Sequence, residues 1–307
     1  MHSALEAAGA QAARLLPLWS FMLWASCIVF VLVMAAFLWA LFHRRPVSPP
    51  DDRKLARIIA GAGAATVLTL FIYLAVDLRV GRATTTVPRP ALVIKLTGHQ
   101  WWWDVEYQDS VLQHRVHTAN EFHIPVGEPV LIQLEAADVI HSFWVPSLAG
   151  KKDLIPGHPN TMWLVADRAG TYRAQCAEFC GHQHAKMAML VIAEPRDRFN
   201  QWYERQLAPA AEPRDSAGEA GRQVFMGSSC PMCHTIQGTL AASRVGPPLT
   251  HLASRHTIAA GTLPNTRGNL GAWILDPQAV KPGASMPPSA LSGRALTALL
   301  AYLESLK

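Results

Sequence analysis

Two clusters of cysteine, histidine and methionine are the residues in this chain whose types and spacing could do chemistry. The first cluster runs from Cys176 to Met187 and includes Cys180 and His184, with His141 standing 35 residues upstream of Cys176. Thiolate, imidazole and thioether groups are soft or borderline ligands that suit copper. Two thiolates four residues apart can bridge two metal ions, and one histidine and one weak axial ligand then complete each site. The cluster therefore predicts a two-copper centre suited to electron transfer.

The same residues allow three other interpretations. Cys176 and Cys180 could form a disulfide bond, or they could bind zinc with His182 or His184. A copper chaperone that uses two cysteines and a distant histidine is the third option. The additional histidine and methionine at fixed offsets favour the copper centre over these alternatives.

The second cluster is Cys230-Pro-Met-Cys233-His234. C-x-x-C-H is the attachment signature of c-type haem, in which the two thiols bind the porphyrin and the histidine binds iron. The bare motif also arises by chance or as half of a zinc site. Met286, which lies 52 residues beyond His234, suits the distal iron position, and His/Met ligation raises the haem potential. His251 and His256 are also near in sequence, but we expect them to be surface or packing residues because Met286 fits better.

The elements that position these clusters begin with two apolar runs, Leu18–Phe42 and Ile58–Val76, which contain no charged residue. Each can span a hydrocarbon core of about 30 Å, and the first is too long for a signal peptide. We expect a transmembrane hairpin within residues 1–90, with helices at about 18–42 and 57–79. The short loop between them is basic, which predicts a cytoplasmic loop and outer termini; its basic residues are Arg44, Arg45, Arg53, Lys54 and Arg57.

Two further domains follow the hairpin. Short β-rich runs punctuated by glycine and proline occupy residues 91–195 and predict an all-β sandwich or barrel; they are Leu92–Leu96, Val130–Leu134, Met162–Val165 and Met189–Ile192. Residues 196–216 are rich in proline and alanine and are predicted to be a linker. Residues 217–307 have a helical composition. The expected fold is therefore a multidomain membrane protein with a helical hairpin, a β domain and an all-α domain.

Charge bears on the partners of these domains. The net charge of +5 is too small and too dispersed to indicate nucleic-acid binding. Residues 91–195 hold 11 acidic and 7 basic residues, a net −4, whereas residues 217–307 hold 3 acidic and 7 basic residues, a net +4. Opposite charges would favour contact between the two domains, and ordinary scatter of surface charge is the alternative explanation. The two apolar runs contain no histidine, so the chain cannot itself house an intramembrane haem–copper site.

Residues 18–194 resemble subunit II of the haem–copper cytochrome c oxidases. That family has a transmembrane hairpin followed by a cupredoxin domain that bears the binuclear copper centre called CuA. The resemblance implies that the Glu178 backbone carbonyl binds copper and that the Glu178 carboxylate lies at a magnesium site shared with the catalytic subunit. It implies copper binding by the side chains of His141, Cys176, Cys180, His184 and Met187.

The segment Gly98–Tyr107, with Trp101, Trp102 and Trp103 in a row, resembles the family's aromatic segment. The resemblance implies that Trp101 is the entry point for electrons. Two departures from the family pattern stand out. His158 occupies a position where family members usually have arginine. The chain also has no acidic residue between Asp52 and Asp77, where many members carry a glutamate at the mouth of a proton channel.

Residues 217–307 resemble a class I cytochrome c domain. The segment Gly246-Pro247-Pro248-Leu249 is similar to a loop whose proline carbonyl orients the axial histidine, and such a bond fixes the imidazole tautomer. Gly221 and Phe225, one helical turn apart, lie where that fold packs its first helix against its last, with Tyr302 as the expected partner. The whole arrangement resembles the caa3-type subunit II.

These resemblances imply an electron-input subunit of a terminal oxidase, with covalent haem c passing electrons to CuA. Subunits I and III, membrane lipid and an electron donor such as cytochrome c would be the partners. A catalytic subunit would reduce oxygen to water and translocate protons, and the oxidase activity would belong to that complex. The resemblance also implies a bacterial inner membrane location, with the CuA and cytochrome c domains on the periplasmic side.

Four alternatives bear on this reading. The chain could be the electron-input subunit of a CuA-containing nitric oxide reductase. Nitrous oxide reductase shares CuA but needs a large propeller domain, for which 307 residues leave no room. A copper chaperone or sensor would bind one labile copper rather than a pair. A quinol oxidase subunit II would keep the fold but lack the copper ligands.

Overall fold

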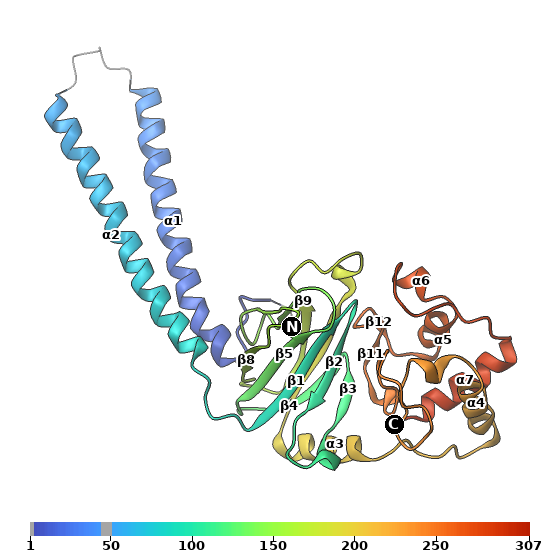
Figure 1. The fold of residues 1–307 in the computed structure, drawn as a ribbon. Helices are drawn as coiled ribbons and strands as arrows, with labels where there is room; N and C mark the ends of the chain where they lie inside the picture. Colours follow the sequence, from blue (N-terminus) through green and yellow to red (C-terminus); the bar gives the residue numbers. More distant parts are fainter. Residues whose placement is uncertain (1–2, 44–50) are drawn as a thin grey trace. The chain divides into compact units, whose positions relative to one another are not determined.

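A computed structural model describes residues 3–43 and 51–307 of the chain (Figure 1). Two compact units are present: residues 13–86 form one, and residues 87–307 with the segment before Ala13 form the other. The basic residues Arg44 and Arg45 of the predicted cytoplasmic loop lie outside the described residues.

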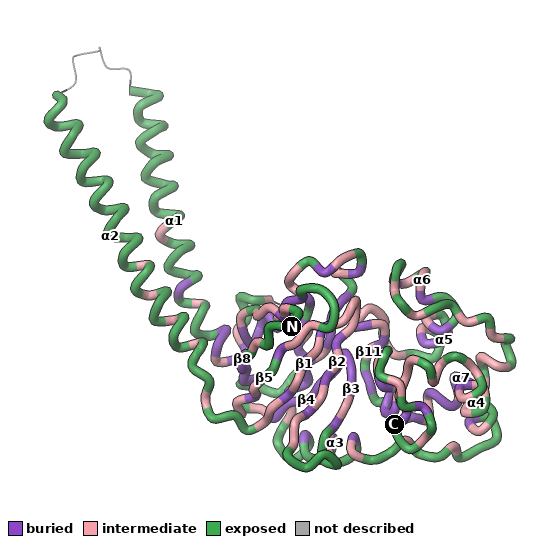
Figure 2. The backbone as a smooth tube through the Cα atoms, in the orientation of Figure 1, coloured by how far each residue is buried: buried purple, intermediate pink, exposed green. Residues whose placement is uncertain are grey.

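The N-terminal hairpin consists of α1 (Ala10–Phe42) and α2 (Asp52–Thr85). Both helices are long and apolar enough to cross a membrane, with windows of mean hydropathy 2.6 and 2.1. Figure 2 shows both as exposed along almost all of their length, as expected for helices that contact lipid. They extend beyond the predicted ranges because helical hydrogen bonding continues past the uncharged core. Asp51 caps α2 by accepting hydrogen bonds from the backbone N–H groups of Arg53 and Lys54.

Ten strands form two five-stranded sheets in the β domain. The first sheet has the order β3-β2-β1-β5-β8 and the second β4-β10-β9-β6-β7. Each sheet contains one parallel pair, β1 with β5 and β10 with β4, among antiparallel pairs. The strands are β1 (Leu92–His99), β2 (Trp102–Tyr107), β3 (His117–Ala119), β4 (Glu121–Pro125), β5 (Val130–Ala136), β6 (His141–Trp144), β7 (Lys152–Leu154), β8 (Asn160–Leu164), β9 (Gly170–Cys176) and β10 (Ala188–Glu194).

The core of this domain lies between the two sheets. Alternate residues of β1 and β2 point into it, as the burial pattern of a half-buried strand requires. Ile94, Leu96, Trp103, Ile132 and Phe143 are completely buried there. The four predicted β-rich runs are all strands, so the expected β-sandwich is confirmed.

The predicted linker begins with an ordered helix, α3 (Arg196–Leu207). Phe199 and Trp202 of α3 are buried in the core of the β domain, where both pack against Tyr107. The prediction missed this helix because it was based on the proline and alanine content of residues 196–216 as a whole. The apolar residues of the helix do recur at helical spacing. The segment without regular structure is therefore short, from residue 208 to residue 215.

The C-terminal domain is helical. Its helices are α4 (Ser216–Met226), α5 (Arg267–Leu275), α6 (Pro277–Val280) and α7 (Gly293–Ser305), with a small hairpin of β11 (Thr257–Ile258) and β12 (Leu263–Pro264). Short 3-10 turns lie at Leu112–His114, His184–Lys186, Cys230–Met232 and Leu252–Ser254.

The predicted packing of the first helix of this domain on its last is confirmed. A Cβ atom on Gly221 of α4 would lie 2.0 Å from the carbonyl oxygen of Ala298 in α7, so the helices approach as closely as glycine permits. Phe225 meets Tyr302 edge to face, with ring centroids 6.1 Å apart.

Candidate functional site

The predicted copper ligands gather at one end of the second sheet. Cys176 ends β9 and His141 begins β6, and these strands are antiparallel neighbours. Cys180 lies in the loop after β9, while His184 begins the 3-10 turn that leads into β10 and Met187 follows that turn. Pairing between β6 and β9 thus brings His141 to the cysteine loop across 35 residues of sequence.

The two thiols are the centre of this site. The Sγ atoms of Cys176 and Cys180 lie 3.7 Å apart, and both cysteines are buried and not disulfide-bonded. Nδ1 of His141 lies 3.9 Å from the Cys176 sulfur, and the backbone oxygen of Glu178 lies 3.2 Å from it. Ligand atoms of His141, Cys176 and Cys180 all lie within 4.8 Å of one another.

Cys180 has an equivalent pair of neighbours. Its sulfur lies 3.6 Å from Nδ1 of His184 and 3.8 Å from Sδ of Met187. Each thiol thus has one imidazole nitrogen and one weak donor beside it. The half-buried His184 ring also meets Phe179 edge to face, with centroids 5.8 Å apart.

These separations fit a tetrahedral metal site. Metal–sulfur and metal–nitrogen bonds of about 2.0–2.3 Å place neighbouring ligand atoms roughly 3.5–3.8 Å apart. The hydrogen bond from the Cys180 thiol, with that of His141, lowers the pKa of Cys176 far below its usual range, which favours the thiolate form that binds metal. The donor set is soft, which suits copper better than the hard cations.

Asp138 is a residue of this site that the sequence interpretation missed. One carboxylate oxygen accepts a hydrogen bond from Nε2 of His141 at 2.8 Å, and the other accepts from the backbone N–H of Gln100 at 2.6 Å. Burial works to raise the pKa of Asp138, but these hydrogen bonds outweigh it and the pKa is lowered. A carboxylate that holds the far nitrogen of a ligating histidine fixes its tautomer, so Nδ1 is left to face the thiols.

Trp101 is attached directly to the cysteine loop. Its indole Nε1–H donates to the carbonyl oxygen of Cys180 at 2.9 Å, and the side chain of Gln100 donates to the same oxygen at 2.9 Å. Trp103 is completely buried instead and packs against His141 and Phe143. The predicted electron-entry residue therefore contacts the loop that carries the predicted copper ligands.

In the helical domain, Cys230 begins a 3-10 turn, and Cys233 and His234 follow it directly. Nδ1 of His234 donates to the carbonyl oxygen of Pro247 at 2.7 Å, as the resemblance implied. Among the residues that the structure describes, no group is hydrogen-bonded to Nε2, so this nitrogen is available to iron. Burial lowers the pKa of His234 and favours the neutral ring that binds metal. A Cβ on Gly246 would lie 2.8 Å from the ring, so glycine is needed beside it.

Two further observations test whether this domain fits a haem. Met286 and Cys230 are half-buried and pack against the domain's apolar core cluster, as residues that line a haem would. Arg255 is buried and donates to the Pro248 carbonyl at 2.6 Å, but its Nε has no partner. Burial lowers the pKa of Arg255 to about 10, so it stays charged at neutral pH. Glu121 and Asp104 act on this charge from a distance, but among the described residues Arg255 forms no ion pair, so the site suits a group that carries carboxylates, as haem does.

The two other histidines of the domain have different partners. Both ring nitrogens of His251 face backbone carbonyls, those of Lys307 and Ala208. His256 contacts the carboxylate of Glu121 in the β domain. Neither ring is therefore placed as a haem ligand, in agreement with the prediction.

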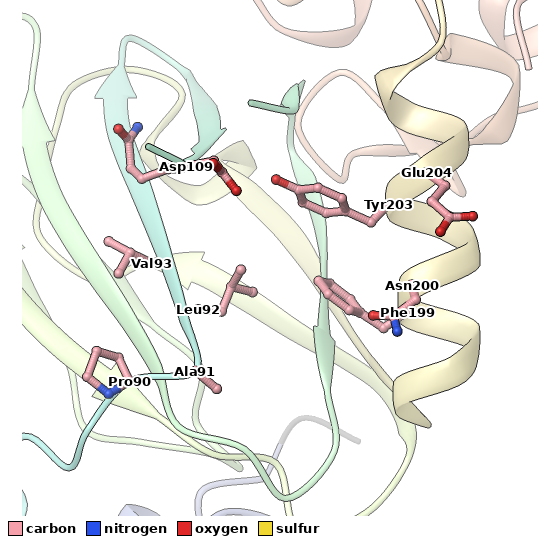
Figure 3. A pocket seen from close by; sticks show the side chains of 10 residues that line it. Pro90, Ala91, Leu92, Val93, Asp109, Phe199, Asn200, Tyr203 and Glu204 are labelled. Atoms are coloured by element: carbon pink, nitrogen blue, oxygen red, sulfur yellow. The ribbon is translucent and has the colours of Figure 1, made fainter. Parts of the chain in front are cut away.

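A surface cavity of about 380 Å³ lies elsewhere, between α3 and the start of β1 (Figure 3). Phe199 and Tyr203 of α3 face Leu92 of β1 across it, as Figure 3 shows. None of the candidate metal ligands lines this cavity, so it does not belong to the metal site.

Comparisons with known proteins agree with this geometry. The family model described as "Cytochrome C oxidase subunit II, periplasmic domain" matches residues 111–194, and the model described as "Cytochrome c" matches residues 218–307. The chain is 45% identical over 215 residues to "Cytochrome c oxidase subunit 2" of Alkalihalophilus pseudofirmus, covering 70% of this chain and 61% of that protein. It is 35% identical over 228 residues to the protein of the same name from a Bacillus species (strain PS3), covering 70% of this chain and 62% of that protein.

The chain thus spans about three fifths of the length of these curated relatives. A solved structure of the periplasmic domain of subunit II of cytochrome oxidase of Bradyrhizobium japonicum is 32% identical, with a TM-score of 0.37; the match covers 39% of this chain and 96% of that chain. Two apolar helices anchor the protein in the membrane. The chain therefore belongs with cytochrome c oxidase subunit II proteins, and it joins a subunit II domain to a C-terminal cytochrome c domain.

Proposed function

We propose that this protein is the electron-input subunit of a haem–copper terminal oxidase. Its cytochrome c domain accepts electrons from an external donor, and its cupredoxin domain passes them to a catalytic subunit that reduces oxygen to water and translocates protons. One observation supports this most strongly. The buried thiols of Cys176 and Cys180 each have an imidazole and a weak donor within 3.9 Å, and Trp101 is hydrogen-bonded to the same loop.

The copper pair and haem c, when bound, each take up and release one electron at a time. The protein's part is to hold these groups with little rearrangement. Cys176 and Cys180 would hold the copper ions through their thiolates, and His141, His184, Met187 and the Glu178 carbonyl would supply the remaining ligands. Asp138 holds His141 in one orientation. Burial of both thiols excludes water from the centre.

In the cytochrome domain, Cys230 and Cys233 would attach the porphyrin covalently, and His234 and Met286 would hold the iron. The hydrogen bond from His234 to Pro247 fixes the axial ring. Covalent attachment of this domain to the cupredoxin domain keeps the donor at a high effective concentration. A soluble or membrane-bound cytochrome c, or another donor, then needs to reach only the tethered haem.

The catalytic subunit I, with subunit III, completes the complex in this proposal. The apolar runs of α1 and α2 carry no histidine, so oxygen reduction belongs to another chain. The missing acidic residue between Asp52 and Asp77 implies that the proton channel entrance is built from other residues. The basic residues Arg53, Lys54 and Arg57 favour a cytoplasmic hairpin loop, which places both metal centres on the periplasmic side of the bacterial inner membrane.

The Glu178 carboxylate is available to a magnesium ion at the interface with subunit I. Its side chain is 44% exposed, and its partner in the structure is Lys151 at 3.7 Å. Replacement of Mg²⁺ by Mn²⁺ in the whole complex should give a bound manganese resonance that the Glu178→Gln variant loses. A resonance that is unchanged in this variant would remove Glu178 from the magnesium site.

The purified membrane complex tests the proposed activity. Oxygen consumption with reduced cytochrome c should be lost in Cys180→Ser and retained in the matched control Cys27→Ser, because Cys27 is exposed on α1 and outside both sites. Nitric oxide reduction in place of oxygen reduction would favour the nitric oxide reductase alternative. Full activity of Cys180→Ser would contradict electron entry through a copper pair, and a single labile copper would favour the chaperone.

A further inference from the structure

A buried lysine joins the cytochrome domain to Trp101. Lys281 follows α6, five residues before Met286, and is only 3% exposed. Its ammonium donates to the backbone carbonyl of Trp101 at 2.8 Å and lies 3.3 Å from that of Ala259. Among the residues that the structure describes, no carboxylate lies within ion-pair distance of it. Its hydrogen bonds thus go to carbonyl groups, and the nearby Cys180 sulfur is the neighbour that works to raise the pKa of Lys281.

The loop that carries Lys281 lies directly against Trp101 and the copper-ligand segment. The Gln183 side chain donates to the Pro282 carbonyl at 2.6 Å, and the Lys186 ammonium donates to the Val280 carbonyl. Gly283 has a left-handed φ of 86°, and a Cβ there would lie 3.9 Å from the Trp101 ring. The loop from 280 to 283, between α6 and the predicted iron ligand, therefore covers the indole.

A second loop of the cytochrome domain, residues 259–262, meets the same surface. The backbone N–H of Ala188, the residue after Met187, donates to the Ala260 carbonyl at 3.0 Å, and Arg173 donates to the Gly261 carbonyl at 3.2 Å. Because Lys281 contacts the Ala259 carbonyl as well as that of Trp101, it ties both loops to the cupredoxin domain at one point.

Burial of the Lys281 ammonium without a carboxylate partner is unfavourable, so we ask what this group contributes. Removing an ammonium group from water without a carboxylate partner is energetically unfavourable. Burial, with the nearby Lys186 ammonium, lowers the pKa of Lys281 to about 7. An apolar side chain of similar length would fill the same space without that cost. The ammonium adds a directional hydrogen bond to the backbone carbonyl of Trp101. Such a contact can select one arrangement of the two domains over alternative packings.

We propose that Lys281 is a positioning residue that seats the haem-ligand loop of the cytochrome domain on Trp101, sets the rate of electron transfer from haem c to CuA, and closes Trp101 to other donors. This inference rests on the proposed function. It assigns to the tethered domain the face of Trp101 that a free donor would otherwise use, so that external donors reach the copper centre through haem c.

The test uses the whole complex with three variants. Lys281→Met keeps the side-chain length and removes the ammonium, Lys281→Gln keeps an N–H donor, and Lys307→Met is the matched control at the exposed C-terminus. After flash reduction of haem c, the rate of copper reduction should fall about tenfold in Lys281→Met, which corresponds to about 1.4 kcal/mol. It should fall less in Lys281→Gln and stay unchanged in Lys307→Met. Lys281→Gln keeps the test open if Lys281→Met does not assemble.

A second measurement tests whether a free donor can reach Trp101. With free reduced cytochrome c as the donor, Lys281→Met should show copper reduction that depends on donor concentration and does not pass through haem c. An unchanged flash rate in Lys281→Met, with both metal centres intact, would overturn the inference and leave the proposed function standing. An altered copper resonance would also overturn it, because Lys281 would then act on the centre and not on docking. Absence of either metal centre from the wild-type complex would instead refute the proposed function.

Discussion

The indole nitrogen of Trp101 donates a hydrogen bond to the backbone carbonyl of Cys180, with a nitrogen–oxygen distance of 2.9 Å. Cys180 also supplies one of the two thiols, so the aromatic ring is linked to the predicted copper ligand by one hydrogen bond and a short stretch of backbone. Lys281 contacts the carbonyl of the same tryptophan from the cytochrome domain. Trp101 therefore contacts both the predicted copper-ligand loop and the cytochrome domain.

Replacement of Trp101 by phenylalanine tests this link. The change keeps an aromatic ring but removes the N–H donor, whose hydrogen bond is worth about 1 kcal/mol. Electron transfer into the copper centre should slow by about five- to tenfold, and the copper resonance should stay nearly unchanged, because no ligand is altered. The measurement is flash-induced copper reduction in the whole complex. Trp102→Phe is the control, since Trp102 stacks on His99. Equal rates in both variants would exclude a special role for Trp101.

Asp138 should control copper retention. Loss of a carboxylate that holds a ligating histidine commonly costs about 10–100-fold in metal affinity. We expect the loss of copper affinity in Asp138→Asn to lie near the lower end of this range, because asparagine still accepts a hydrogen bond from His141. The loss in Asp138→Ala should lie near the upper end. Competition with a copper chelator gives the measurement, with Asp109→Asn as the control because Asp109 lies in a turn away from the site. A copper affinity in Asp138→Ala equal to that of the wild type would show that His141 binds copper without the Asp138 hydrogen bond.

Gly246 should be required beside the axial histidine. In Gly246→Ala the added methyl group would lie 2.8 Å from the His234 ring, so the ring or the loop must move. Overpacking of this kind costs about 1–3 kcal/mol, which thermal unfolding of the cytochrome domain, followed at the haem absorption band, would detect. Gly268→Ala, at a position with no atom within 4 Å, is the matched control and should be neutral or slightly stabilising. Equal losses in both variants would refute the steric argument.

The contact between His256 and Glu121 should make domain docking depend on pH. The Glu121 carboxylate accepts from the His256 ring at 3.0 Å and from its backbone N–H at 2.9 Å. The first of these hydrogen bonds raises the pKa of His256, and the pKa of Glu121 is lowered to about 2 despite its burial. The pKa of His256 is higher when the domains are docked than when they are apart. The free energy that His256 contributes to docking is therefore fully present below its undocked pKa of about 6.5.

That contribution is lost as pH rises through the raised pKa of His256. Electron transfer from haem c to copper should therefore decline with rising pH, and His256→Gln should remove this part of the profile. Lys281 is present in both proteins, so the difference between the two profiles belongs to His256. Superimposable profiles from pH 5.5 to 8.5, a range that brackets the ordinary histidine pKa of about 6.5, would exclude His256 as a docking contact.

Much of the fold could be predicted from local sequence, and so could the residues that gather as candidate ligands. The apolar runs, the β-rich runs and the two cysteine motifs each lie within a short segment, and their spacing carries the information. The helix α3 was missed because its apolar residues Phe199 and Trp202 are diluted by the prolines and alanines of the segment that contains it. Its stability comes from packing on the β-domain core, which local composition does not record.

The residues that hold the candidate ligands and Trp101 in position, Asp138 and Lys281, could not be predicted. They act through contacts between segments that are distant in the sequence. Asp138 is a loop carboxylate like many others until the fold places it against the far side of His141. Lys281 and Trp101 are 180 residues apart in sequence, and only the docked domains bring them together. The opposite net charges predicted contact between the domains, and the ion pair of Arg244 with Glu106 at 3.0 Å is one such contact. Charge alone did not indicate which residues would meet.

Spectroscopy of the purified membrane complex tests the central claim most directly. Electron paramagnetic resonance and a pyridine haemochrome spectrum, with metal analysis, would count and characterise the centres. The account predicts two copper ions per chain that share one unpaired electron, shown by a seven-line hyperfine pattern, and one covalently bound haem c. A single mononuclear copper, zinc in its place, or no covalent haem would contradict the account.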